Sequence, residues 1–370
     1  PFIRANAMEA AELLPKRAVP IVQLGLTDDR AVVRFVSLVT LGQRELKQLV
    51  PVADSLGDDS SASVRAARLY ALQRCGVKVD MTPLARQLAS EDPQVRSNAA
   101  MLLGRLGQPS AIPMLRQHAR QPMPRVSAPR EAIVRLQFAE AMARLGDDEA
   151  LSSIRAGMFS SFGEVRVLAI TIVGQIEDQR MEGLLFRLLG SEEEPPEIHL
   201  AAARAISNYR SPAVIHDLIR ASQRVWNAAA SPQPLLRTQA VMTLGDIEAA
   251  REDIRRDLLS GAPEPIRRRF HDDRGCRVLA ERLGDANEKV RLAAAAAILR
   301  VLDAAGLNEP NPAAATDREA IEPPAESSAD RTGDSEDETD PESGAADASG
   351  TEELETSEAP LPPLDLDPPE

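Results

Sequence analysis

Acidic side chains recur at regular intervals and could serve as carboxylates for acid–base or metal chemistry. They are Asp28, Asp29, Asp58, Asp59, Asp92, Glu164 and Asp285, and each precedes a Val-Arg pair or a close variant of it. A catalytic site needs one exceptional constellation, whereas these residues form a periodic series. An acid at a helix start also caps free backbone N–H groups, and the arginine that follows can pair with the acid of its own or the neighbouring unit. The pattern therefore predicts a structural ladder, with one rung in each unit: Asp29, Arg34, Asp59, Arg65, Asp92, Arg96, Arg135, Arg166, Asp285 and Arg291.

Other reactive residue types are scattered. The two cysteines, Cys75 and Cys276, lie far apart and form no CxxC pair, which argues against a zinc site or a disulfide framework. No histidine has a second histidine or cysteine three or four positions later, and no phosphate-binding glycine loop or nucleophile elbow is present. The histidines are His118, His199, His216 and His271. We therefore expect no metal, no cofactor and no enzymatic activity.

The elements that carry these residues are short amphipathic helices. In the stretch EDPQVRSNAAMLLGRLG, Asp92 and Pro93 indicate a helix start, and Gly107 indicates its end. Val95, Ala99 and Leu102 belong to one apolar stripe between them. A second, shorter amphipathic segment follows at 110–118. One unit is thus a helical hairpin whose apolar face must be covered by its neighbours.

This unit is repeated along the chain. Its anchor dipeptides are Ile3-Arg4, Val33-Arg34, Val64-Arg65, Val95-Arg96, Val134-Arg135, Val165-Arg166, Ile198-His199, Leu236-Arg237 and Val290-Arg291. Successive anchors are 30, 31, 31, 39, 31, 33, 38 and 54 residues apart. A period near 31 residues is typical of a solenoid, and the 39-residue step contains an inserted proline-rich loop at 121–129.

The periodicity predicts helices throughout the first 305 residues. The expected helices are Ile3–Leu14, Pro20–Leu26, Val32–Gly42, Leu46–Leu56, Val64–Cys75, Pro83–Ala89, Val95–Leu106, Ala111–Ala119, Arg130–Leu145, Glu149–Met158, Glu164–Ile176, Met181–Leu189, Glu197–Asn208, Pro212–Ala229, Leu235–Ile247, Ala250–Leu259, Ile266–Leu283 and Asn287–Ala305.

The pattern D-x-x-x-V-R-x-x-A-x-x-x-L-G resembles the short bacterial HEAT repeat, also called the PBS-lyase HEAT-like repeat. The resemblance covers residues 1–303 and implies an all-α fold: a right-handed α-solenoid of HEAT-like helical hairpins. We expect a solenoid domain at 1–305, with about nine units of which the first is cut at its N-terminus. The family resembles interaction scaffolds more often than enzymes.

Charge divides the chain into two parts. From Val301 onward there are 21 acidic residues and two basic ones, a net charge of −19, so residues 1–300 carry +5 of the total of −14. Low apolar content predicts a disordered acidic tail at 306–370. No apolar run reaches the roughly 20 residues of a transmembrane helix. Because the chain begins inside a repeat, we expect a missing N-terminal part that could carry a signal or an anchor; otherwise a cytoplasmic location is favoured.

Two departures from the repeat are candidate partner-binding residues. One is the basic run Arg267-Arg268-Arg269-Phe270, which could contact phosphate or nucleic acid, bind an acidic tail, or form a solvated helix face. The other is Trp226, the single tryptophan, which could contact a partner or pack under a loop. With only 3% aromatic residues, the chain offers few platforms for stacked bases, so nucleic acid is disfavoured.

Three functions remain open. We predict a monomeric, non-catalytic protein–protein interaction scaffold that binds a protein partner along the solenoid surface. One alternative, implied by the family, is a phycobilin lyase-like or lyase-accessory protein, which would need a bilin-sized pocket. The other is a nucleic-acid-binding HEAT-like protein, including a DNA glycosylase, which would need a basic concave face and a catalytic aspartate.

Overall fold

The computed structural model describes residues 18–209, 211–257 and 274–307. Within these ranges the regular elements are helices, and no strand is present. The predicted helix Ile3–Leu14 and nearly all of the predicted disordered tail lie outside the described residues. The all-α prediction is confirmed for the part that the structure describes.

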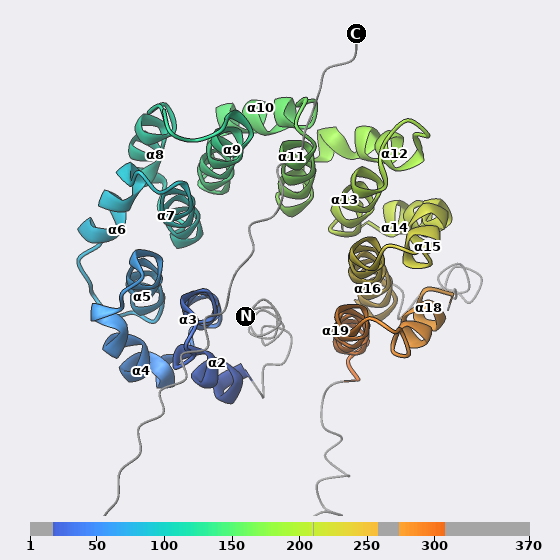
Figure 1. Cartoon of the computed structure of the whole chain (residues 1–370), viewed down its shortest axis with the longest axis horizontal. Coiled ribbons are helices and arrows are strands. Elements are labelled where there is room, and N and C mark those ends of the chain that lie inside the picture. Colours follow the sequence, from blue (N-terminus) through green and yellow to red (C-terminus); the bar gives the residue numbers. More distant parts are fainter. Residues whose placement is uncertain (1–17, 210, 258–273, 308–370) are drawn as a thin grey trace, which may run out of the picture. The chain divides into compact units, whose positions relative to one another are not determined.

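The helices form successive hairpins, each with a first and a second helix (Figure 1). The first helices are α2 (Ala18–Leu26), α4 (Val50–Asp54), α6 (Thr82–Arg86), α8 (Ile112–Ala119), α10 (Asp148–Gly157), α12 (Glu182–Gly190), the pair α14 (Pro212–Ala221) and α15 (Gln223–Ala229), and α18 (Arg274–Arg282). The second helices are α3 (Ala31–Arg44), α5 (Ala62–Arg74), α7 (Pro93–Leu106), α9 (Ala128–Arg144), α11 (Gly163–Gln175), α13 (Pro196–Ser207), α16 (Pro234–Asp257) and α19 (Glu288–Ala304). Short 3-10 turns supplement the first helices at Lys47–Leu49, Ser55–Asp58, Gln87–Ala89, Pro109–Ala111 and Gln179–Met181.

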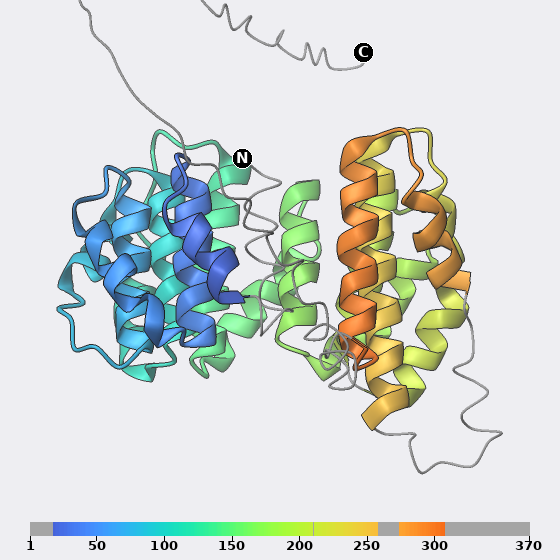
Figure 2. The same cartoon turned by 90° about the horizontal axis from the view of Figure 1, so that it is seen from below.

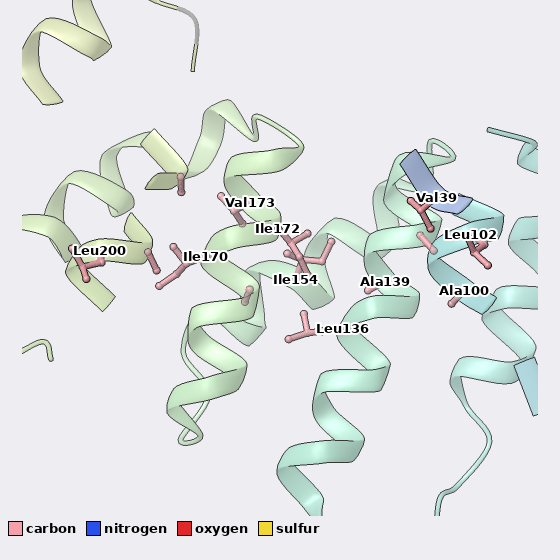
Figure 3. Packing of buried hydrophobic residues seen from close by; sticks show 14 of the residues in the cluster. Val39, Ala100, Leu102, Leu136, Ala139, Ile154, Ile170, Ile172, Val173 and Leu200 are labelled. Atoms are coloured by element: carbon pink, nitrogen blue, oxygen red, sulfur yellow. The ribbon is translucent and has the colours of Figure 1, made fainter. Parts of the chain in front are cut away.

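Second helices pack directly on one another, and first helices form a separate row beside them (Figure 1). One buried apolar cluster runs through this two-layer arrangement, from Ala18 to Val301. Leu136 of α9, Ile154 of α10 and Ile172 of α11 show how it joins neighbouring hairpins (Figure 3). Each hairpin therefore buries its apolar stripe against the next one, as a solenoid requires.

Helix α7 shows how the repeat pattern encodes these elements. The Asp92 carboxylate accepts a hydrogen bond from the Gln94 N–H group, and Pro93 occupies the first helical position. Gly107 ends the helix with a φ of 73°, in the left-handed region that glycine tolerates best.

Two boundaries differ from the sequence-based expectation. The expected helices Leu235–Ile247 and Ala250–Leu259 form one continuous helix, α16, because no glycine or proline interrupts 246–257 and α19 packs along it. The expected single helix Pro212–Ala229 is divided at Ser222. The Ser222 side chain is buried and its hydroxyl donates to the Leu218 carbonyl at 2.6 Å, a bond that competes with the regular backbone pattern and bends helices.

Glycines set the spacing between alternate pairs of second helices. A Cβ atom added at Gly174 of α11 would lie 2.4 Å from the Cα atom of Ala205 on α13. A side chain at these positions would collide with the next helix, so the helices approach closely only where Cβ is absent. The same relation holds at three other crossings: Gly42 with Tyr70 and Ala71, Gly104 with Ala141, and Gly245 with Ala297.

No helix among the described residues is both long enough and apolar enough to cross a membrane.

Candidate partner-binding site

The turns between helices lie at two edges of the solenoid, and the two edges carry different residues. Because successive helices run antiparallel, every turn from a first helix to the second helix of the same hairpin lies at one edge, which we call the hairpin edge (Figure 2). These turns are 27–30, 59–61, 90–92, 120–127, 158–162, 191–195, 230–233 and 283–287. The predicted acids and most of the ladder arginines are at this edge, so it is the surface to examine for function.

Two rungs of the ladder are bidentate ion pairs between an arginine of a second helix and an aspartate in the turn that precedes the next second helix. Arg34 on α3 donates from Nε and Nη2 to the two carboxylate oxygens of Asp59, at 2.7 and 3.0 Å. Its Nη1 donates to the backbone carbonyls of Asp28 and Asp29. Arg237 on α16 repeats this arrangement with Asp285, at 3.0 and 2.9 Å, and bonds the carbonyls of Ser231 and Pro232.

These two aspartates share a position that the sequence pattern alone did not distinguish. Each lies two residues before the cap of a second helix and accepts the N–H group of the cap residue, Ser61 or Asn287. The same turn is built with serine before α7, α11 and α16, at Ser90, Ser160 and Ser231. Aspartate at this position leaves a charged oxygen for the preceding arginine, whereas serine offers none.

The pKa values of both aspartates reflect this pairing. Burial of Asp59 disfavours its charged form, but hydrogen bonds from Arg34 and the Ser61 N–H group outweigh burial and lower its pKa. Hydrogen bonds from Arg237 and from the Asn287 N–H group lower the pKa of Asp285. These carboxylates are therefore ionised structural groups at neutral pH.

The remaining ladder positions are held differently. Arg65 and Arg291 donate to backbone carbonyls at Asp59 and Asp285, and Asp92 caps α7. Arg166 pairs with Glu194 at 2.6 Å, whereas Arg135 pairs with Glu131 of its own helix. Asp29 lies 3.8 Å from Arg30. A uniform rung of one acid and one arginine in each unit is thus an oversimplification, because the acid occurs at the required turn position in only some units.

Arg96 departs furthest from the ladder. Its side chain is 4% exposed, and within the described residues no carboxylate lies within ion-pair distance of it. Nη2 donates to the His118 carbonyl at 2.7 Å, Nε has no partner, and the Phe138 ring centroid is 5.9 Å from Cζ. Burial lowers the pKa of Arg96. The turn position that would supply its acid is occupied by Arg125, inside the inserted loop.

An aspartate at position 125 should complete this rung. We expect Arg125→Asp to raise the free energy of unfolding by about 1 kcal/mol, because a buried guanidinium gains a carboxylate. Chemical denaturation of the variant measures the change. Arg125→Ala is the control and should be neutral, since Arg125 makes only an exposed pair with Glu91 at 3.7 Å. A destabilised aspartate variant would contradict the interpretation.

Exposed apolar side chains gather at the hairpin edge. Among the described residues, ten large apolar side chains are exposed, and six of these lie in a hairpin-edge turn or within three residues of one. They are Leu24, Val32, Phe159, Phe162, Leu235 and Leu283. Phe159 is 70% exposed and Phe162 39%, in the turn between α10 and α11. These side chains lie at four of the eight turns, and grouped apolar side chains such as the two phenylalanines are typical of a protein-binding surface.

Positive charge is concentrated in two neighbouring hairpins. Residues 81–146 contain nine arginines and four acids, a net charge of +5, which equals the net charge of the whole of residues 1–300. Several of these arginines are not neutralised: Arg86, Arg105 and Arg120 form no ion pair within the described part of the chain, and Arg130 donates to the amide of Gln94. The basic character of the body is therefore local.

A groove of 520 Å³ lies beside this basic region, between first helices α8 and α10 with α9 beneath it. Its floor and walls contain small residues, Ala119, Ala132, Ala139, Ala150, Ala156 and Gly157. Arg116, Arg120 and Arg135 also line it, and Asp147 and Glu149 stand at the end away from the hairpin edge. Arg116 pairs with both of these acids, at 2.6 and 3.4 Å.

A second groove, of 820 Å³, lies at the opposite edge between α11, α13, α16 and α19. Its charged groups are largely paired with one another, and Asp246 bonds both Arg204 and Arg300. Between α16 and α18, Cys276 contacts the buried pair Glu248 and Arg251. Burial, reinforced by Glu248, raises the pKa of Cys276, so its thiol is protonated at neutral pH and is a poor nucleophile.

The structure treats the two candidate partner-binding features of the sequence, the basic run and the tryptophan, differently. Arg267, Arg268, Arg269 and Phe270 lie outside the described residues. Trp226 on α15 packs against the apolar core, and the Arg274 guanidinium lies 4.3 Å from its ring centroid. A cation–π contact between Trp226 and Arg274 thus stabilises the packing of α18 on α15.

Comparison with known protein families identifies the type of helical repeat. Residues 81–160 match the family model for HEAT repeats. This part of the chain contains HEAT repeats. No curated protein sequence matches it.

Several solved structures are similar to the HEAT-repeat chain. The complex of CpcE and CpcF of phycocyanin lyase from Nostoc sp. is 16% identical, with 62% of this chain and 94% of that chain covered and a TM-score of 0.37. Human deoxyhypusine hydroxylase is 18% identical, with 70% and 98% covered and a TM-score of 0.30. An engineered protein is 16% identical, with 76% and 96% covered and a TM-score of 0.30.

Sequence reasoning missed the exposed phenylalanines and the groove. Phe159 and Phe162 lie between the expected helices Glu149–Met158 and Glu164–Ile176, and two aromatic residues in so short a loop are a signal that could have identified them. The groove had no such signal, since its lining comes from α8, α9, α10 and the start of α11.

Proposed function

We propose that this HEAT-repeat protein is a non-catalytic scaffold that binds a partner protein along its hairpin edge. The observation that carries the proposal is the presence of exposed apolar side chains at four of the eight hairpin-edge turns, with two phenylalanines in the turn 158–162. Burying such side chains yields roughly 25 cal/mol for each Å² removed from water, and contacts spread over several repeats suit an extended partner.

The charged groups support a structural rather than catalytic role for the acids of this edge. Asp59 and Asp285 are each held by two hydrogen bonds from an arginine and one from the backbone. A carboxylate with a lowered pKa that is fully engaged by an arginine is a poor general base or acid.

The experiment is to isolate the tagged full chain from cells that express it and to identify stoichiometric partners. The variant Phe159→Ser with Phe162→Ser should lose its main protein partner while its melting temperature stays within about 2 °C, because both side chains are exposed. Val77→Ser is the matched control: Val77 is 38% exposed and follows α5 at the opposite edge. Recovery of the same partner by the phenylalanine variant would contradict the proposal.

A further inference from the structure

The groove between α8 and α10 is long enough for a short extended segment of polypeptide. Its lining on the α10 side runs from Asp147 to Ser160, which corresponds to about 20 Å of helix. An extended chain covers this length with about six residues. Exposed Phe159 precedes Ser160, which lines the hairpin-edge end of the groove.

The shape of the groove follows from its small residues. Ala156 and Ser153 of α10 are exposed and line one wall, and Ala132 of α9 lies opposite on the other helix. Gly157 contacts Leu136 and Ala169 so closely that an added Cβ atom would lie 3.0–3.2 Å from their side chains. The small apolar residues leave room on the floor for an apolar side chain of a ligand.

The charges define which segment fits. Three arginines and two acids line the groove, and Arg116 is paired with both acids, whereas Arg120 is exposed at the groove without an ion pair. Arg135 is 55% exposed and pairs with Glu131 of its own helix, an arrangement that a second carboxylate can share. Buried Arg96, which lacks a carboxylate, adds positive potential behind the same loop.

A polypeptide fits these features better than a nucleic acid does. The pairing of Asp147 and Glu149 with Arg116 leaves available arginines only in the hairpin-edge half of the groove, which suits a short segment with localised carboxylates better than a continuous phosphate backbone. The alanine floor also offers no flat aromatic surface for base stacking.

We propose that the groove binds an acidic segment of a partner protein, with carboxylates at Arg120 and Arg135 and an apolar side chain on the alanine floor. This inference rests on the proposed scaffold function and specifies the chemistry of the partner. The carboxylates of the segment offset the net positive charge of the two basic hairpins. The exposed phenylalanines extend the contact beyond the groove.

The test is selection of 12-residue peptides from a random phage-displayed library on the full chain, with Ala156→Trp as the counter-selection. Because Ala156 is exposed, the indole should fill the groove without disturbing the core. Selected peptides should be enriched in Asp and Glu around one large apolar residue. Their affinity should fall about ten-fold for Arg120→Glu and less than two-fold for Arg187→Glu, a matched reversal at an exposed α12 arginine without an ion pair.

Several outcomes would overturn the inference. These are peptides without acidic enrichment, equal selection by the Ala156→Trp variant, or equal loss of affinity for both charge reversals. Stronger binding of a 12-nucleotide single strand than of the peptides at the same site would assign the groove to nucleic acid. Selection only by a chain ending at residue 315 would assign it to residues 316–370. If selection fails while Phe159→Ser with Phe162→Ser still loses its partner, the scaffold function stands and this inference fails alone.

Discussion

Gly174→Val should lower the free energy of unfolding by about 3 kcal/mol, because the added side chain collides with backbone rather than with a flexible side chain. Its Cβ atom alone would lie 2.4 Å from the Ala205 Cα atom and 2.9 Å from the Ala205 carbonyl oxygen. Helices α11 and α13 must separate to admit it, and the buried residues around this crossing, including Ile170 and Ile206, would lose contacts. Denaturant unfolding followed by circular dichroism measures the loss.

Gly163→Ala is the matched control within the same helix. A Cβ atom at Gly163 meets nothing within 4 Å, and glycine is a poor helix former, so this change should be neutral or stabilising by up to about 1 kcal/mol. Equal effects of the two substitutions would show that the crossing does not depend on the missing Cβ atom.

Asp59→Ala should cost about 2 kcal/mol, since it leaves Arg34 without the carboxylate that holds it against the next hairpin. Both partners are largely buried, with 14% of the Arg34 side chain and 5% of the Asp59 side chain exposed. Asp58→Ala, at an exposed neighbouring acid, is the control and should change stability by less than about 0.5 kcal/mol.

The pH dependence of stability gives an independent measure of this rung. The pKa of Asp59 is lowered from its ordinary value of 3.8, so the folded state binds the proton less tightly than the unfolded state does. Its contribution is complete above pH 5 and is lost as the pH falls below 4 through the lowered pKa. Asp59→Asn should therefore flatten the loss of stability between pH 5 and 3. An unchanged slope would show that Asp59 is not the group responsible.

Local signals predicted the helical hairpins because each hairpin carries its own start and stop. Asp92-Pro93 and Gly107 delimit α7 in both the sequence and the structure. The predicted helix boundaries were wrong where contacts between helices, rather than local sequence, determine where a helix ends. The expected helices Leu235–Ile247 and Ala250–Leu259 are joined in α16, because packing on α19 keeps the helix continuous. The division of α14 from α15 depends on one buried hydroxyl, Ser222, that no periodicity reveals.

The candidate site was less predictable than the fold because it depends on how residues in different hairpins are aligned. The Val-Arg anchor located Arg34 and Arg96 equally well, but only Arg34 has an aspartate at the turn position of the following helix. That position is recognisable only after the cap of each second helix is known. The groove, likewise, requires alanines of α8, α9 and α10 to meet across a hairpin boundary.

The most direct test of the central claim is hydrogen–deuterium exchange of the purified complex with the partner, compared with the free chain. The account predicts that binding slows exchange at the hairpin-edge turns, most strongly at 158–162, and along α8 and α10 beside the groove. Protection confined to the opposite edge, at the turns that join one hairpin to the next, would contradict it.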